Sequence, residues 1–203
     1  MSQRRAPSQS RSRDMVNRIM ESCKALIVAE GDVDVSMREI ASQAGIAPSS
    51  VYQYFDSRDA VLLKIVESYF QDTRSFLRSL PPTVYDKQQL TDAIGSALQH
   101  LLDIYNKEPA LLVIMDRIKR SPALTEMDVS GSKKNSAEIA KQILQSAPDL
   151  NPAEVKIVSD LLTHLVGWGV RYAASIKGKK KQQDTLRHLQ SMIVIKIETL
   201  VNG

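Results

Sequence analysis

The sequence feature that most constrains the fold is the stretch from Ser36 to Arg58, which has the pattern of two short helices joined by a tight turn. Ser36 is followed three residues later by Glu39, a spacing that predicts a capping box at a helix start. Gly45 can adopt the positive φ that ends a helix, and Pro48 suits the first turn of the next helix. Helices this short need a third helix to pack against. The pattern therefore predicts a helix-turn-helix, whose second helix enters the major groove of DNA.

The side chains of this second helix divide into an inward and an outward set. Val51 and Phe55 are spaced i, i+4 and face inward. Gln53 faces outward, where it can hydrogen-bond adenine bidentately, and tyrosine hydroxyls can reach phosphate oxygens. The residues predicted to contact DNA are Ser36, Arg38, Pro48, Ser49, Ser50, Tyr52, Gln53, Tyr54 and Arg58. An αα-hairpin with a glycine turn also occurs in helical proteins that bind no DNA, so this pattern alone leaves both interpretations open.

Residues 37–62 resemble the DNA-binding signature of the TetR family of bacterial regulators; they read MREIASQAGIAPSSVYQYFDSRDAVL. The match runs through Arg38-Glu39-Ile40-Ala41, Ala44-Gly45, Val51-Tyr52, Tyr54-Phe55 and Ser57-Arg58. Two positions depart from the family pattern: Ala47 stands where the family often has serine, and Ser49 where it often has glycine. The resemblance implies a homodimeric transcriptional regulator with a pocket for a small-molecule effector in its C-terminal domain.

Composition sets the outer bounds on the class of protein. A hydrophobic content of 43% and a charged content of 25% are ordinary for a soluble globular chain of 203 residues. The sequence contains no apolar run long enough to span a membrane, and its polar N-terminus does not resemble a secretory signal. Cys23 is the only cysteine, so no disulfide can form within the chain. These features predict a cytoplasmic protein with no membrane association.

The charge distribution separates the first residues from the rest of the DNA-binding part. Residues 1–13 contain four arginines and no acidic residue, and we expect them to form a flexible basic arm. Such an arm can enter the minor groove of DNA or remain a solvated terminus. Residues 14–60 contain four basic and eight acidic residues. Affinity for DNA phosphates would therefore depend on the arm and on local placement of the basic side chains.

The hydrophobic periodicity predicts an all-α fold of about nine helices, with no strand pattern. We expect a three-helix helix-turn-helix domain at 14–56 and a larger helical domain for effector binding and dimerisation at 57–203. Besides the two short helices, the predicted helices are 14–30, 57–80, 86–106, 110–119, 135–146, 152–176 and 183–201. The segment Ser130-Gly131-Ser132 is predicted as a break or a mobile loop, and the lysine-rich segment 177–181 as a solvated turn.

The last two predicted helices are apolar on most of their faces, so most of each must be buried. Packing against a second copy satisfies this requirement, and the TetR resemblance implies the same interface. We therefore predict a homodimer formed through the helices near 152–176 and 183–201. A twofold dimer would bind a pseudo-palindromic double-stranded DNA operator in successive major grooves.

Signals for catalysis, metals or cofactors are weak. The three histidines have no ligand partner at helical spacing, and no nucleophile or phosphate-loop motif is present, so an enzyme is disfavoured. Residues predicted to bind an effector are Phe76, Tyr105, Met115, His164, Trp168 and Tyr172. The polar members of this set are also explained as interface groups of the dimer. The function predicted is a ligand-responsive DNA-binding regulator, most simply a repressor, and the alternative is a helical adaptor that binds other proteins.

Overall fold

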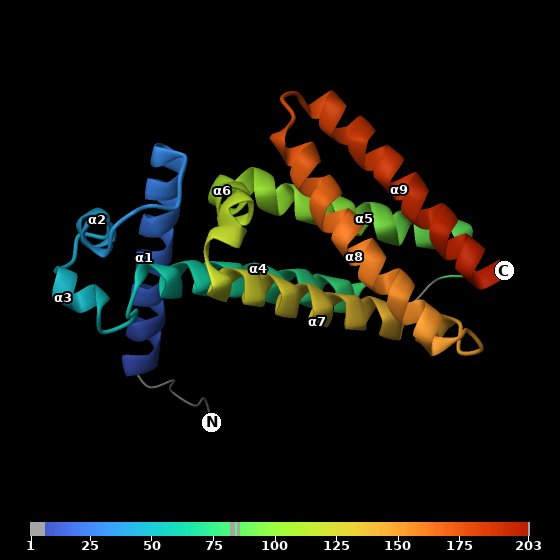
Figure 1. Cartoon of the computed structure of the whole chain (residues 1–203), viewed down its shortest axis with the longest axis horizontal. Helices are drawn as coiled ribbons and strands as arrows, with labels where there is room; N and C mark the ends of the chain where they lie inside the picture. Colours follow the sequence, from blue (N-terminus) through green and yellow to red (C-terminus); the bar gives the residue numbers. More distant parts are fainter. Residues whose placement is uncertain (1–6, 82–83, 85, 203) are drawn as a thin grey trace. The chain divides into compact units, whose positions relative to one another are not determined.

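The computed structural model describes residues 7–81, 84 and 86–202, and their regular structure is entirely helical (Figure 1). Within these ranges there are nine α-helices, one short 3-10 helix and no strand, which confirms the predicted all-α fold. The elements are α1 (Pro7–Glu30), α2 (Met37–Gln43), α3 (Pro48–Val51), α4 (Arg58–Ser79), α5 (Lys87–Lys107), α6 (Pro109–Arg117), η1 (Ile118–Arg120), α7 (Pro122–Ser146), α8 (Pro152–Ser175) and α9 (Lys179–Asn202). No helix in the described ranges combines the length and the apolarity needed to cross a membrane.

Helix α1 begins at Pro7, seven residues before the predicted start at Asp14. Proline is favoured in the first turn of a helix because its missing N–H has no intrahelical partner there. Part of the predicted flexible arm at 1–13 is therefore helical, and Arg11 and Arg13 lie on the exposed first turns of α1. The remainder of that arm, residues 1–6, lies outside the described residues.

Helix α7 passes without a break through the segment that was predicted to be a loop. A Cβ atom on Gly131 would lie only 2.4 Å from the ring of Phe70 on α4. The glycine therefore allows α7 and α4 to approach closely. Helix α7 continues through this position without interruption. The prediction of a break at Gly131 was wrong because a glycine needed for close packing and a glycine that ends a helix look the same in sequence.

The chain divides into two compact units. Unit 1 comprises the described residues up to Glu67 together with Glu108–Met127, and unit 2 comprises the remaining described residues. Unit 1 thus contains α6 and η1 in addition to α1, α2 and α3, although these segments are far apart in the sequence. Helices α4 and α7 each contribute residues to both units.

The core of unit 1 forms where α1 packs against α2 and α6. The α1 side chains Ile19, Cys23 and Ile27 are fully buried, in the spacing expected for one helix face. Burial raises the pKa of the Cys23 thiol to about 12, with a smaller opposing effect from Arg58, so this cysteine is a packed, protonated core residue. The other fully buried side chains of this core include Ile40, Ala41, Val51, Val61, Leu62 and Ile114.

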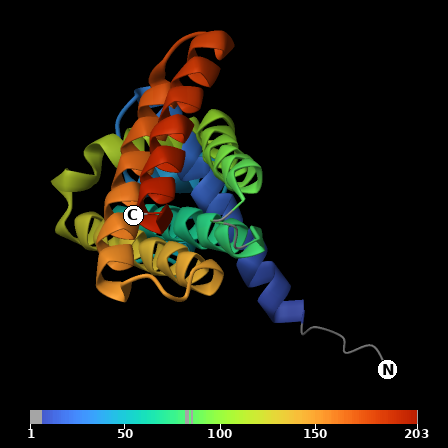
Figure 2. The same ribbon diagram turned by 90° about the vertical axis from the view of Figure 1, so that its right-hand side faces the viewer.

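The core of unit 2 forms where α5 packs against α8 and α9, which lie side by side in both views (Figures 1 and 2). Helix α8 begins as predicted: the Asn151 side chain accepts a hydrogen bond of 2.9 Å from the Ala153 N–H, and Pro152 occupies the first turn. Its buried face and that of α9 meet the apolar face of α5. The buried residues include Leu98, Leu102, Tyr105, Val155, Val170, Leu189, Ile193 and Ile197.

Candidate nucleic-acid interface

The turn between α2 and α3 is determined by hydrogen bonds that the local sequence predicts. The Ser36 hydroxyl accepts a hydrogen bond of 3.2 Å from the Glu39 N–H, and the Glu39 carboxylate accepts one of 2.7 Å from the Ser36 N–H. These two bonds form the predicted capping box at the start of α2. They also hold the pKa of the Glu39 carboxyl below its ordinary value.

Gly45 ends α2 with a φ of +62°, in the left-handed region that favours glycine. The Ile46 N–H donates to the Ala41 carbonyl at 3.0 Å and the Gly45 N–H to the Ser42 carbonyl at 3.0 Å, which is the Schellman pattern. A side chain at position 45 would also meet the Arg18 guanidinium at 3.0 Å. The backbone conformation therefore requires glycine at this turn, whereas the flexible Arg18 side chain could move away from an added Cβ.

The second helix of the motif, α3, is a single turn followed by further hydrogen-bonded turns. Its N-cap residue, Ala47, makes no side-chain capping bond, because alanine has no side-chain hydrogen-bond acceptor. The Phe55 N–H donates to the Val51 carbonyl at 3.0 Å, which continues helical bonding past the end of α3. Val51 and Phe55 are both buried, so the predicted inward pair is confirmed.

The residues predicted to contact DNA lie at the start of α2, on α3 and the turns that follow it, and at the start of α4. Tyr52 is 55% exposed, so its ring and hydroxyl are free to contact a phosphate. Ser50, Tyr54 and Arg58 are half-buried. The exposed members of the set are Ser36, Arg38, Pro48, Ser49, Tyr52 and Gln53. Most of the set is therefore accessible, and its contacts with DNA stay a prediction.

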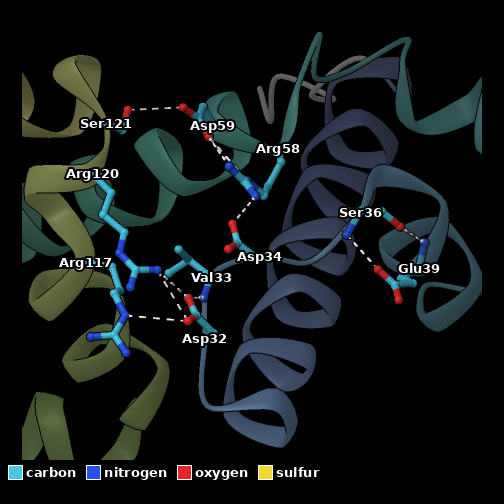
Figure 3. A network of polar contacts seen from close by, with 10 residues as sticks. All are labelled: Asp32, Val33, Asp34, Ser36, Glu39, Arg58, Asp59, Arg117, Arg120 and Ser121. Atoms are coloured by element: carbon cyan, nitrogen blue, oxygen red, sulfur yellow. Dashed lines mark hydrogen bonds and ion pairs between the residues drawn. The ribbon is translucent and has the colours of Figure 1, made fainter.

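Arg58 differs from the others because its guanidinium is already paired within unit 1. Its Nη1 atom lies 2.8 Å from an Asp34 carboxylate oxygen, and its Nη2 atom lies 3.2 Å from Asp59 (Figure 3). Arginine in such a pair contacts a phosphate only by sharing or exchanging its partners. The sequence alone does not reveal this pairing, because Asp34 is 24 residues away from Arg58.

A second group of charges, which the sequence analysis missed, joins the connection before α2 to the α6–η1 segment. The Asp32 carboxylate lies 3.4 Å from Arg120 and 3.6 Å from Arg117 (Figure 3). The Asp32 carboxylate also accepts a hydrogen bond of 2.6 Å from the Val33 N–H. This backbone bond is the main cause of a lowered Asp32 pKa, with smaller effects from the two arginines.

Three more polar contacts lie within unit 1. The Ser121 hydroxyl lies 3.1 Å from Asp59, and Lys24 on α1 lies 2.6 Å from Glu108 and 2.5 Å from Glu21. Burial alone would lower the pKa of Lys24, but its bonds to the two glutamates raise it above the ordinary value. Lys24 is therefore a charged, largely buried link between α1 and the start of α6.

These ion pairs offset part of the excess of acidic over basic residues in the segment 14–60. Asp32, Asp34 and Asp59 each face an arginine within unit 1, and two of those arginines come from beyond residue 60. Neutralised carboxylates repel DNA phosphates less than free ones do. The acidic excess of the helix-turn-helix is therefore smaller in the folded unit than in the sequence.

The residues predicted to bind an effector fall into buried and exposed sets. Phe76 stacks on His100 with ring centroids 3.9 Å apart, and Met115 is buried on α6 in unit 1. Trp168 and Tyr172 stack on each other with their side chains 63% and 52% exposed, and His164 is also exposed.

Tyr105 is the most deeply buried of the predicted effector residues. Its hydroxyl donates a hydrogen bond of 3.1 Å to the Tyr69 hydroxyl inside unit 2. Burial raises the pKa of Tyr105, and Tyr69 and Arg171 oppose part of that rise. Two buried hydroxyl groups of the same unit, on Thr73 and Ser159, have no hydrogen-bond partner among the described residues. No group of side chains that could hold a metal ion was found in the described ranges.

The segment that contains the helix-turn-helix also matches known proteins in sequence. Residues 19–65 match the family model of bacterial regulatory proteins of the tetR family. The chain is 31% identical over 90 residues to an uncharacterized HTH-type transcriptional regulator in the dhlA 5′ region of Xanthobacter autotrophicus; the match covers 43% of this chain and 45% of that protein. It is 26% identical over 140 residues to an HTH-type transcriptional regulator of Mycobacterium tuberculosis strain H37Rv, covering 69% of this chain and 66% of the relative. The chain thus spans about half of the first relative and just under two thirds of the second.

Solved structures extend the similarity of fold over most of the chain. The fatty acid degradation regulator FadR of Bacillus halodurans superposes with a TM-score of 0.71 at 12% identity, covering 95% of this chain and 97% of that one. A TetR-family transcriptional regulator of Bordetella parapertussis superposes with a TM-score of 0.61 at 18% identity, covering 88% and 93%. At these identities the likeness establishes the fold alone.

Proposed function

We propose that the chain, whose residues 19–65 match the family model of bacterial regulatory proteins of the tetR family, represses transcription as a homodimer that binds a pseudo-palindromic operator and responds to a small-molecule effector. The names of the family and of the relatives are those of transcriptional regulators, which confirms the expectation that the chain is not an enzyme. A helical adaptor remains the alternative function, and it predicts no binding to DNA.

One observation carries the DNA-binding part of this proposal: α3 and the turns that follow it bury Val51 and Phe55, while Ser49, Tyr52 and Gln53 stay exposed. Such a helix is held rigidly by its apolar side and presents hydrogen-bonding groups on the other. Gln53 is suited to reading a base edge, because its amide both donates and accepts. Tyr52 and Tyr54 are suited to phosphate contacts, which position the protein without specifying sequence.

The homodimer is supported by a row of large apolar side chains on the outer face of α8 and α9. The members of this apolar row are Ile157, Leu161, Trp168, Tyr172, Met192 and Ile195, and each is between 52% and 63% exposed. Large exposed apolar side chains on two adjacent helices are typical of a protein interface. In a C2 dimer the same row of the second copy would cover it and would place two α3 helices on one operator.

The proposal that an effector binds is supported by buried hydroxyl groups of unit 2 that have no hydrogen-bond partner among the described residues. A buried hydroxyl without a partner costs free energy, and the hydroxyls of Thr73 and Ser159 are in this state among the described residues. An effector that supplies hydrogen-bonding groups to such hydroxyls would favour the conformation that it binds best. Repression would end when that conformation holds the two α3 helices at the wrong spacing for the operator.

Fluorescence anisotropy tests the DNA-binding proposal directly. The labelled duplex is the DNA immediately upstream of the protein's own gene, a scrambled duplex is the control, and both are titrated at several salt concentrations. We expect the native duplex to bind more tightly than the scrambled one, with an affinity that falls steeply as salt rises. If neither duplex binds even at low salt, the regulator is excluded and the adaptor is favoured.

A further inference from the structure

A groove of about 560 Å³ runs between α7 and α8 within unit 2. Its floor is apolar and is formed by Ala137, Ala140 and Leu144 of α7 and by Pro152 of α8. The three α7 residues are spaced i, i+3 and i+7, so they form one straight row along the helix. Two of them are alanines, whose small side chains leave space between the helices that larger residues would fill.

The rim of this groove is positively charged. Lys133 and Lys141 line the α7 side, and neither has an ion-pair or hydrogen-bond partner in the part of the chain that the structure describes. On the α8 side, Lys156 lies 3.3 Å from Asp160, which also accepts a hydrogen bond from the Ser136 hydroxyl. The single carboxylate of the rim is therefore satisfied within the protein, while two ammonium groups are not.

The spacing of the two unpaired lysines suits a helical partner. Residues 133 and 141 are eight apart, which is about 12 Å along α7 at 1.5 Å per residue, or slightly more than two turns. Acidic residues seven or eight positions apart on a helix lying along the groove would meet these two lysines. The apolar face of that helix would cover the floor, as an amphipathic helix does when it binds in an apolar groove.

We propose that the α7–α8 groove binds an amphipathic helix of another protein, with apolar side chains on one face and glutamate or aspartate on the flanks. A second copy of this chain is a poorer occupant, because its proposed contact is the apolar row on α8 and α9. On α8 the mean direction of the groove residues lies about 120° around the helix from that of Ile157 and Leu161, at 100° per residue. The interface with the partner helix is thus separate from the proposed dimer interface and does not depend on DNA binding.

The test uses the full chain and a pair of designed, fluorescently labelled peptides of about 20 residues, long enough to be helical in water. One peptide carries leucine on one face and glutamate on both flanks, and in the other lysine replaces every glutamate. We expect saturable binding of the glutamate peptide at one per chain, weakening as salt rises, and no binding of the lysine peptide. Equal binding of both peptides, or no saturable binding of the glutamate peptide, would overturn the proposal.

Variants of the chain test whether the peptide binds in the α7–α8 groove. We expect K133E/K141E to weaken the glutamate peptide at least tenfold and to gain binding of the lysine peptide, and we expect Ala140→Trp to weaken the glutamate peptide by filling the floor. The matched control is K180E/K181E, which makes the same change in net charge at the exposed start of α9. If this control weakens the peptide equally, the attraction is unspecific and the proposal fails. A molar mass that falls in K133E/K141E would instead make the groove part of the self-interface, which also overturns it.

Discussion

Helix α3 and the α8–α9 pair expose side chains of opposite chemistry. Around α3 the exposed residues are serine, glutamine, arginine and tyrosine, whereas α8 and α9 expose six large apolar side chains. Polar groups that hydrogen-bond can exchange water for base edges and phosphates, but apolar rings and chains gain free energy only by leaving water. The comparison therefore supports the proposals that the surface of unit 1 binds DNA and that the apolar row of unit 2 binds a second copy of the chain.

The largest expected effect comes from placing charge in the apolar row. The double variant L161E/W168E should be monomeric, and its operator affinity should fall by about 100-fold or more, because each α3 then binds alone. Molar mass from light scattering and anisotropy with operator DNA measure the two effects. The control is Lys180→Glu, which adds negative charge at an exposed position outside the row. A dimeric double variant would remove the basis for assigning this row to the interface.

A change on α3 should affect DNA binding without affecting dimerisation. Gln53→Ala should relax discrimination at one operator base pair by roughly 1–3 kcal/mol, because a bidentate base contact is lost. Tyr54→Ala serves as the comparison, since loss of a phosphate contact weakens binding to all sequences by a similar factor. Competition with operators mutated at single positions separates the two outcomes. Unchanged binding of every sequence by both variants would show that this helix does not read DNA.

A methyl group at Gly131 should destabilise unit 2. The added Cβ would lie 2.4 Å from the Phe70 ring, so Gly131→Ala should cost about 1–3 kcal/mol of unfolding free energy by overpacking. Gly167→Ala is the matched control, because its Cβ would meet nothing closer than 3.5 Å. That variant should be stabilised by up to about 1 kcal/mol, as alanine favours a helix interior over glycine. Urea unfolding of both variants measures the difference, and equal stabilities would contradict the close packing of α4 and α7.

Removal of the cap of α2 should have a smaller effect, confined to unit 1. Ser36→Ala loses the side-chain bond to the Glu39 N–H and should cost about 1 kcal/mol. Hydrogen exchange should show faster opening of α2 amides, while α8 and α9 amides keep their protection. Faster exchange throughout the chain would mean that the two units unfold together.

The smallest expected effect is on the pH dependence of the stability that the same cap contributes. The folded pKa of Glu39 lies below the ordinary 4.5, so its contribution to stability is complete above that pH and is lost as pH falls through the lower folded value. Glu39→Gln has no carboxyl to protonate there, and its melting temperature should fall less than that of the wild type between about pH 5 and about pH 3. Parallel curves for the two proteins would show that the capping bond does not persist in solution. Asp32, whose pKa is also lowered, is unchanged in both proteins and so does not affect the comparison.

Local signals in the sequence were sufficient to predict most of the helix-turn-helix. The capping box at Ser36, the glycine turn at Gly45 and the inward pair on α3 all depend on residues within a few positions of each other. Their conformations follow from backbone geometry and short hydrogen bonds, which are nearly the same in any fold. The start of α1 was missed by seven residues, because the arginine-rich segment before Asp14 has no apolar periodicity that would reveal a helix.

The amino-acid sequence by itself determined the helical class, the turn that presents α3 and the apolar character of α8 and α9. Only the tertiary structure decided that Asp32 faces an arginine 88 residues away, that Arg58 is already paired, and that Gly131 is a packing contact inside a helix. It also decided that Trp168 and Tyr172 lie on the surface while Tyr105 is buried. The physical reason is that caps and periodicity act over one or two turns, whereas pairing and burial depend on which distant segments the fold brings together.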